Sequence, residues 1–330
     1  MKILKQILPV FLRVGISIVL LIFLFRHVDA KALWKVVSNA DIGLVLLAAF
    51  IYFSLYILAL FRWEMLLKGA KVYLPLKRVI ISFAGGNFFN IFLPSSIGGD
   101  LIRSIDLATH TKRPREVVTT VLLDRLSGYI GLVTVTLLAL VFGWGLVEEK
   151  SVFWSVAVIT GVLVVALLIL FNSFLYSKIN QILHSPTAGR MREAIKNLHQ
   201  EIHIFRHRKN IIVNNLILSI LIQSITPLTF YIIALSLGVK INIAYFFVYI
   251  PIIGAITLLP ISIGGLGLRD ATTIYFFSKA GMSKDLAFAM SLINFSFILV
   301  YALIGGLIYV LNIHHRRMQY HKPQQVHPCP

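Results

Sequence analysis

Long apolar runs, separated by short polar segments, dominate this chain of 330 residues. Crossing the hydrocarbon core of a bilayer takes about 20 mostly apolar helical residues. Each run of that length therefore predicts a membrane-spanning helix. The qualifying runs are 7–25, 42–61, 79–97, 117–143, 152–171, 211–237, 244–263 and 286–311. The pattern predicts an all-α polytopic membrane protein with about 8 hydrophobic segments.

Two of these runs contain helix-breaking and polar residues. Segment 79–97 includes Gly85, Gly86, Asn87, Asn90 and Pro94, and segment 244–263 includes Pro251, Gly254 and Pro260. Irregular backbone is tolerated at membrane depth only where protein or a water-filled cavity surrounds it. We expect both segments to be re-entrant, so that each enters and leaves on one side of the membrane. Full crossings are the alternative.

The distribution of Lys and Arg distinguishes these two topologies. With both segments re-entrant, one side of the membrane carries 21 Lys and Arg residues and the other carries 8. Such an asymmetry follows the positive-inside rule, with both termini cytoplasmic. Full crossings would instead export the basic segment 98–116. The count favours the re-entrant topology, in the plasma (inner) membrane of a bacterium.

Composition excludes several other classes of protein. The chain is 58% hydrophobic and 13% charged, whereas soluble domains carry about 25% charged residues. The net charge of +18 falls in short segments between apolar runs, an arrangement that favours anionic lipid headgroups over nucleic acid. The single cysteine, Cys329, cannot form a disulfide within the chain.

The sequence contains an internal repeat. Residues 93–103 read LPSSIGGDLIR and residues 259–269 read LPISIGGLGLR, with seven of eleven positions identical at an offset of 166 residues. Each half then holds three spanning helices and one re-entrant hairpin. Because three is odd, the second half must face the opposite way. An inverted repeat of this kind is common among transporters, where broken helices of the two halves meet near the bilayer midplane.

The repeat defines the organisation of a single membrane domain, 1–330. The first half covers 1–145 and the second covers 146–311. The second half contains a cytoplasmic segment, 172–210, with the apolar spacing of an amphipathic surface helix. Residues 312–330 form a polar cytoplasmic tail.

The two Ser-Ile-Gly-Gly motifs are candidate anion sites. If a helix starts near Gly98 or Gly264, its amino end directs unpaired N–H groups and a positive partial charge at the cavity. Arg103 and Arg269 occupy equivalent positions and carry the forked donors that fit phosphate. The alternative is that the glycines only permit tight hairpins and the arginines extend to the headgroup region.

A second candidate is the charged pair Asp124-Arg125 inside segment 117–143. A charge at the centre of a spanning helix costs about 2.5–3.5 kcal/mol on insertion scales, so it marks a functional candidate. The alternative is a structural pair that holds this helix against a hairpin. The repeat replaces the pair by Met290-Ser291, so we expect more ionisable groups in the cytoplasmic half of the cavity.

The predicted headgroup-binding residues combine these motifs. They are Ser95, Ser96, Gly98, Gly99, Asp100, Arg103, Asp124, Arg125, Ser262, Gly264, Gly265 and Arg269. No catalytic constellation, cofactor site or metal site is predicted, and we expect the protein not to be an enzyme. The expected partners are membrane lipids, either an anionic phospholipid or a polyprenyl-phosphate-linked lipid, and a lipid-modifying enzyme.

Three motifs carry a resemblance to a known family. FNIFLPSSIGGDLIR (89–103), LLDRLSGYIGL (122–132) and LLPISIGGLGLRDA (258–271) resemble the flippase-like membrane region of lysyl-phosphatidylglycerol synthases and of stand-alone proteins that share it. The resemblance implies movement of a charged or glycosylated lipid between leaflets. The synthases also carry a soluble aminoacyl-transferase domain after this region, and the chain ends at 330, so lipid aminoacylation is not carried over.

Two functions follow as expectations. The first is a flippase-like protein that translocates or handles an anionic or glycosylated lipid between leaflets. The second is an accessory or catalytic component of membrane glycolipid or aminoacyl-lipid biosynthesis, in which Asp100 or Asp124 would act on a lipid phosphate.

Overall fold

The computed structural model describes residues 36–92, 96–111, 113–143, 150–171, 208–257, 262 and 265–320. Within these ranges the protein is helical and contains no strand. The helices are α3 (Ile42–Gly69), α4 (Leu76–Phe92), α5 (Ser96–Ala108), α6 (Pro114–Phe142), α7 (Lys150–Phe171), α10 (Lys209–Ser236), α11 (Ile243–Thr257), α12 (Leu268–Lys279) and α13 (Lys284–Tyr320). The predicted all-α class is confirmed.

Four of these helices, α3, α6, α10 and α13, are long and apolar enough to cross a membrane. They coincide with the predicted spans 42–61, 117–143, 211–237 and 286–311. Helix α7 covers the predicted span 152–171. The predicted span 7–25, most of the amphipathic segment 172–210, and residues 321–330 of the polar tail lie outside the described residues.

Each of the two interrupted runs belongs to a pair of packed helices. The first run contains most of α4 and is followed by α5, and these two helices pack together as the first hairpin. The second run contains α11, and α12 begins five residues after the run ends and packs against α11 as the second hairpin. Helix α5 begins at Ser96, two residues before the expected start near Gly98. Helix α12 begins at Leu268, four residues after the expected start near Gly264. The later start follows from Gly265 and Gly267, whose φ angles of +75° and +77° interrupt a right-handed helix.

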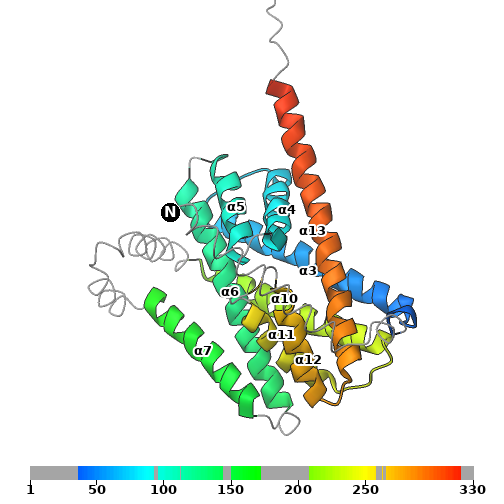
Figure 1. Cartoon of the computed structure of the whole chain (residues 1–330). Helices are drawn as coiled ribbons and strands as arrows, with labels where there is room; N and C mark the ends of the chain where they lie inside the picture. The colour runs from blue at the N-terminus through cyan, green and yellow to red at the C-terminus, as the bar shows by residue number, and fades with distance from the viewer. Residues whose placement is uncertain are drawn as a thin grey trace, which may run out of the picture.

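The two helix pairs lie at opposite ends of the bundle (Figure 1). The pair α4–α5 is in the upper part of that view and α11–α12 in the lower part. Helix α6 starts beside α5 at the top and ends at the bottom, whereas α13 starts beside α12 and ends at the top. Helix α4 packs against α13, α11 packs against α6, and α3 packs against α10.

Glycines set the closest of these contacts. A Cβ on Gly305 would lie 2.8 Å from the carbonyl oxygen of Ala84, and one on Gly306 would lie 2.4 Å from the Phe88 ring. Helix α13 therefore approaches α4 at backbone distance. The pair Gly305-Gly306 serves packing within the chain.

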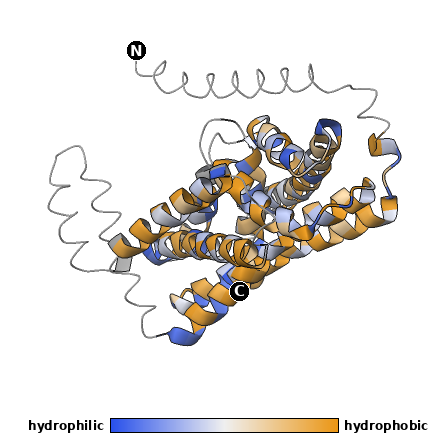
Figure 2. Cartoon of the chain, turned by 90° about the horizontal axis from the view of Figure 1, so that it is seen from below, coloured by the Kyte–Doolittle hydropathy of each residue, from blue (hydrophilic) through white to orange (hydrophobic). Residues whose placement is uncertain are grey.

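Apolar side chains fill the interior and also cover the outside. One core cluster joins α10, α11, α12 and α13, with Phe246, Ile252 and Phe277 completely buried. Large apolar side chains such as Phe142, 86% exposed, and Phe50, 74% exposed, face outward, and Figure 2 shows apolar residues on the outer sides of the helices. An apolar exterior is what a protein surrounded by lipid requires.

Four arginines that the topology count assigned to loops are buried: Arg62, Arg78, Arg103 and Arg269. Buried charges carry no information about topology because they do not face the membrane surface. Removing these four from the count of 21 against 8 leaves 18 against 7. The asymmetry of the remaining charges has the same direction.

Candidate functional site

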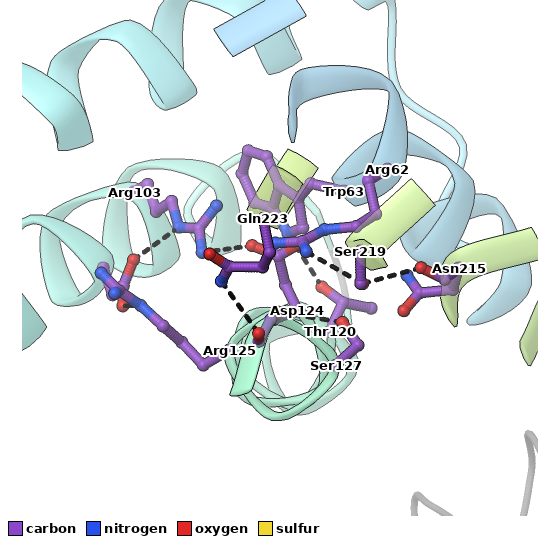
Figure 3. A network of polar contacts seen from close by, with 12 residues as sticks. Arg62, Trp63, Arg103, Thr120, Asp124, Arg125, Ser127, Asn215, Ser219 and Gln223 are labelled. Carbon is purple, nitrogen blue, oxygen red and sulfur yellow. Dashed lines mark hydrogen bonds and ion pairs between the residues drawn. The ribbon is translucent and has the colours of Figure 1, made fainter. Parts of the chain in front are cut away.

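Asp124 is the centre of a buried ion-pair network (Figure 3). One of its carboxylate oxygens accepts a hydrogen bond from Arg62 Nε at 2.8 Å, and the other accepts from Arg103 Nη2 at 3.0 Å. The three side chains are each at most 8% exposed. Because they come from α3, α5 and α6, one carboxylate joins two spanning helices to the first hairpin.

The network continues from Arg103 to Asp100 and Arg125. Asp100 and Arg103 are three residues apart on α5 and so share a face of that helix. The Arg103 Nε lies 3.0 Å from the Asp100 carboxylate as an ion pair, without hydrogen-bond geometry. Arg125 Nε donates to the other oxygen of Asp100. Since neighbours on a helix point about 100° apart, Asp124 and Arg125 reach α5 at different points.

Packing and hydrogen bonds hold the arginines in place. The guanidinium carbon of Arg103 lies 4.7 Å from the centre of the Trp63 ring, a cation–π contact. The Trp63 indole N–H donates to Thr120 Oγ1 at 3.3 Å. Arg62 Nη1 donates to Ser219 Oγ at 3.0 Å, which adds α10 to the network. The donors of the site are therefore fixed in direction before any ligand arrives.

The first hairpin closes through two glycines. A Cβ on Gly99 would lie 2.0 Å from the carbonyl oxygen of Gly86, so α4 and α5 cross backbone to backbone at this point. Asn90 on α4 accepts a hydrogen bond from the Gly99 amide at 3.0 Å. This crossing brings Asp100 and Arg103 on α5 next to the polar residues of α4.

A cavity of about 190 Å³ adjoins the network. All five charged side chains of the network line it, together with Tyr56, Asn87, Asn90, Tyr129 and Gln223 among others. Three guanidinium groups face two carboxylates, which leaves a surplus of one positive charge. Each guanidinium group contacts a carboxylate, but the three share only two of them, and fixed guanidinium groups are strong donors to oxyanions. The cavity is therefore suited to an anion.

A second polar group surrounds Arg269 in the second hairpin. Arg269 contacts the carboxylate of Asp270 at 3.3 Å and donates to Ser291 Oγ at 3.3 Å. Asp270 is completely buried and accepts further hydrogen bonds from Ser291 and, at 3.0 Å, from the Gly267 amide. A backbone amide at the amino end of α12 is therefore already hydrogen-bonded to the Asp270 carboxylate. Unlike Arg103, Arg269 has an acidic partner next to it in sequence.

An apolar groove lies beside the polar cavity. It has a volume of about 700 Å³ and is formed by side chains of α6, α7 and α11, among them Leu126, Leu132, Val158, Ile159 and Ala255. Tyr129 lines both the groove and the polar cavity. Different faces of α6 therefore present charged residues to the polar cavity and apolar residues to the groove.

The structure brings together the predicted residues of the first half. Gly98 and Gly99 lie in the first turn of α5, close to Asp100 and Arg103, and α6 supplies Asp124 and Arg125. The side chain of Ser96, and Ser95 and Gly264 entirely, lie outside the described residues.

The predicted residues of the second half belong to the other hairpin. Ser262 is 5% exposed, and its hydroxyl has no hydrogen-bond partner among the described residues. Gly265 holds a left-handed turn before α12. Charged side chains are more numerous at the first hairpin than at the second. Five form the network around Asp124, and Arg78 and Asp106 form a further ion pair between α4 and α5, whereas only Arg269 and Asp270 pair in the described part of the second hairpin.

Sequence reasoning missed Arg62, Asp270, Ser219 and Gln223. Arg62 was assigned to the basic segment 62–78 because the apolar run ends at residue 61, but α3 continues to Gly69. The helical spacing of Trp63, Leu66 and Leu67, all buried, could have revealed that continuation. Gln223 on α10 donates to the Gly128 carbonyl at 2.9 Å, a contact for which the sequence offers no signal.

Comparisons with known proteins agree with this architecture. The model of the family described as the lysylphosphatidylglycerol synthase TM region matches residues 10–306. A UPF0104 membrane protein of Pyrococcus horikoshii is 23% identical over 327 residues, which cover 91% of this chain and 95% of the relative. A UPF0104 membrane protein of Methanothermobacter thermautotrophicus is 25% identical over 283 residues, 78% of this chain and 81% of the relative.

No solved structure matches the chain. The family match nevertheless spans both hairpins and all four long helices up to Gly306. It agrees with the resemblance of the three sequence motifs. This chain is a multi-pass membrane protein and belongs to the lysylphosphatidylglycerol synthase transmembrane-region family.

Proposed function

We propose that this protein moves the headgroup of an anionic or glycosylated lipid between the leaflets of its membrane. The observation that carries the proposal is the cavity beside Arg103, in which five charged side chains gather inside a helix bundle with an apolar exterior. Charges at membrane depth are costly and mark the pathways of substrates and ions. The surplus of guanidinium groups selects for an anion.

The helix bounds support an inverted repeat. Helices α10 and α11 begin at residues 209 and 243, each 167 residues after the start of α3 and of α4, close to the predicted offset of 166. The packing supports it as well, because exchanging the halves converts the contact α4–α13 into α11–α6. The opposite directions of α6 and α13 agree with such an axis.

In this proposal the two hairpins enter the membrane from opposite faces. The headgroup passes along the polar interior while the hydrocarbon chains stay in the bilayer. Arg103 and Arg125 bind the phosphate on the cytoplasmic side, with help from the amides of the first turn of α5. The polar side chains around Arg269 form the equivalent binding position in the second half of the repeat.

We also propose that both termini are cytoplasmic, since the Lys and Arg residues that remain after the four buried arginines are removed keep an asymmetry of 18 against 7. Both relatives named above are archaeal, so the family is not confined to bacteria. The bacterial inner membrane is the location we predict for this chain. A lipid-modifying enzyme is the predicted partner, because a translocase handles a lipid that another protein makes or uses.

The second candidate, a role in lipid biosynthesis, would use Asp100 or Asp124 as an acid or base. Both carboxylates accept contacts from arginine side chains, and this arrangement favours an electrostatic and structural role over proton transfer. These ion pairs favour transport without a chemical step over a role in biosynthesis. A strain lacking the protein tests the choice: a missing lipid species would point to synthesis, and a normal inventory with altered leaflet distribution to transport.

The direct experiment measures the transfer of chain-labelled phosphatidylglycerol between leaflets of liposomes that contain the purified protein. We expect transfer to exceed that of protein-free liposomes, and Arg103→Gln to reduce it at least tenfold. Arg115→Gln, which alters an exposed arginine at the start of α6, is the matched control and should transfer lipid like the wild type.

Arg103→Gln also removes a buried ion pair, so its folding is checked by thermal unfolding in detergent. Arg103→Lys keeps the charge but loses the forked donor, and we expect partial transfer. Equal transfer by folded Arg103→Gln and wild-type protein would remove Arg103 from the mechanism. No transfer by the wild type in liposomes of several lipid compositions would contradict the proposal itself.

A further inference from the structure

The polar cavity and the apolar groove share Tyr129 as a common wall. On one side of it, Arg125 and Gly128 face the polar cavity. On the other side, Leu132 and Val133, on the following turn of α6, face the groove. Two compartments of opposite polarity with one common wall fit a ligand that is itself divided into a polar and an apolar part.

The two volumes agree with a divided ligand. Sites for whole small molecules occupy about 300–1,000 Å³. The polar cavity, at about 190 Å³, is smaller than that range, so it has room for a compact headgroup and not for an oligosaccharide. The groove, at about 700 Å³, falls within the range. Apart from Ser155, the Tyr129 hydroxyl and the indole N–H of Trp154, its lining side chains are apolar, which suits a hydrocarbon chain.

The charge of the cavity further limits the class of headgroup that can bind. Arg62, Arg103 and Arg125 face Asp100 and Asp124, so the empty site carries one net positive charge. A phosphodiester, with one negative charge, neutralises it. An aminoacylated headgroup carries an additional ammonium group and would place cation against cation at low dielectric, where such contacts are strongly unfavourable.

We infer that the cavity binds the singly charged phosphodiester of a lipid with a compact headgroup and discriminates against cationic headgroups, while a hydrocarbon chain of the same lipid lies in the groove between α6, α7 and α11. The inference rests on the proposed function and names its substrate class. Tyr129 lies at the junction of headgroup and chain.

Lipid binding to the purified protein in detergent, measured by native mass spectrometry, tests the headgroup. The probes are phosphatidylglycerol, lysyl-phosphatidylglycerol and phosphatidylcholine with identical chains, and glycerophosphoglycerol, which is the phosphodiester headgroup of phosphatidylglycerol without its chains. We expect phosphatidylglycerol to bind at least tenfold more tightly than lysyl-phosphatidylglycerol. Glycerophosphoglycerol should bind at least a hundredfold more weakly than phosphatidylglycerol, because it leaves the groove empty.

Variants separate the two compartments. Arg125→Gln removes the surplus charge and should weaken phosphatidylglycerol binding at least tenfold, whereas Arg115→Gln should not change it. Val158→Trp fills the groove from α7 and should weaken phosphatidylglycerol binding at least fivefold without affecting the binding of glycerophosphoglycerol. Val164→Trp is the matched control, since this exposed valine of α7 is outside the groove.

Equal or tighter binding of lysyl-phosphatidylglycerol would overturn the inference about charge. Equal effects of Val158→Trp and Val164→Trp would overturn the assignment of the lipid's hydrocarbon chain to the groove. Neither of these binding results decides whether the protein moves lipid between leaflets. The liposome transfer assay tests the translocase proposal separately.

Discussion

Arg103 and Arg62 bind opposite oxygens of the same carboxylate, that of Asp124, at 3.0 and 2.8 Å. The first arginine belongs to the hairpin helix α5 and the second to the spanning helix α3. In the proposed function, an anion that drew Arg103 away from Asp124 would leave α6 bonded to α3 but would loosen its contact with α5. Ligand binding would then be coupled to the packing of the first hairpin.

Asp124→Asn should destabilise the protein strongly. The substitution leaves the buried Arg62 without a carboxylate and leaves Arg103 with only its ion pair to Asp100. Breaking a buried ion pair costs about 3–5 kcal/mol. Reversible unfolding in mixed micelles measures the loss of free energy. The control is Glu64→Gln, whose carboxylate pairs with an exposed lysine, Lys68, at 2.8 Å. That change should cost about 1 kcal/mol or less, and equal losses in both variants would contradict the central role of Asp124.

The double variant Arg62→Gln/Asp124→Asn should be less destabilised than the sum of its two single variants. Each single change leaves a charge buried without its main partner, whereas the double change removes both partners of the 2.8 Å pair. Coupling energies of contacting residues are about 0.5–3 kcal/mol. The same unfolding experiment on all four proteins gives the coupling, and additive losses would mean that the two side chains act independently.

Gly99→Ala should separate the helices of the first hairpin. Its Cβ would lie 2.0 Å from the Gly86 carbonyl oxygen, and backbone cannot move aside cheaply. We expect a lower apparent melting temperature and loss of lipid transfer. Gly161→Ala on α7 provides the comparison, because nothing lies within 4 Å of its Cβ. Alanine in an exposed helix interior should stabilise this position by about 0.5–1 kcal/mol; similar behaviour of the two variants would argue against close packing at Gly99.

Asp270→Asn should destabilise the second hairpin. The buried carboxylate accepts hydrogen bonds from Arg269, Ser291 and the Gly267 amide, and a neutral amide cannot balance the arginine. We expect increased hydrogen exchange at the start of α12, measured by mass spectrometry, with little change in α5. Asp285→Asn, in the first turn of α13, should cost at most about 1 kcal/mol through the helix dipole. Unchanged exchange in α12 of Asp270→Asn would show that this carboxylate does not hold the turn.

Much of the fold follows from patterns that need no knowledge of tertiary contacts. Apolar length predicted the helices α3, α6, α7, α10 and α13, because the thickness of the bilayer fixes how long a spanning run must be. Helices α4 and α11 end at Phe92 and Thr257, shortly before Pro94 and Pro260, because proline acts locally on the backbone. The other marked residues, Gly85, Gly86, Pro251 and Gly254, lie inside these helices and do not end them. The bounds of the hairpin helices were less predictable, since the left-handed turn at Gly265 and Gly267 depends on how Asp270 caps α12.

Part of the site could also be read from the chain. A charge inside an apolar run is conspicuous, and this singled out Asp124 and Arg125. Arg62 was not conspicuous, because it stands at the end of its run, beside residues that resemble an ordinary basic loop.

The sequence by itself determined that this is a helical membrane protein with two interrupted segments and charged residues at the first of them, because hydrophobic length and backbone geometry are local properties. Only the tertiary structure decided that Arg62 and Arg103 share one carboxylate and that a polar cavity meets an apolar groove at Tyr129. Those relationships join residues of α3, α5, α6, α7 and α11, and they depend on how the helices cross, which no local pattern encodes.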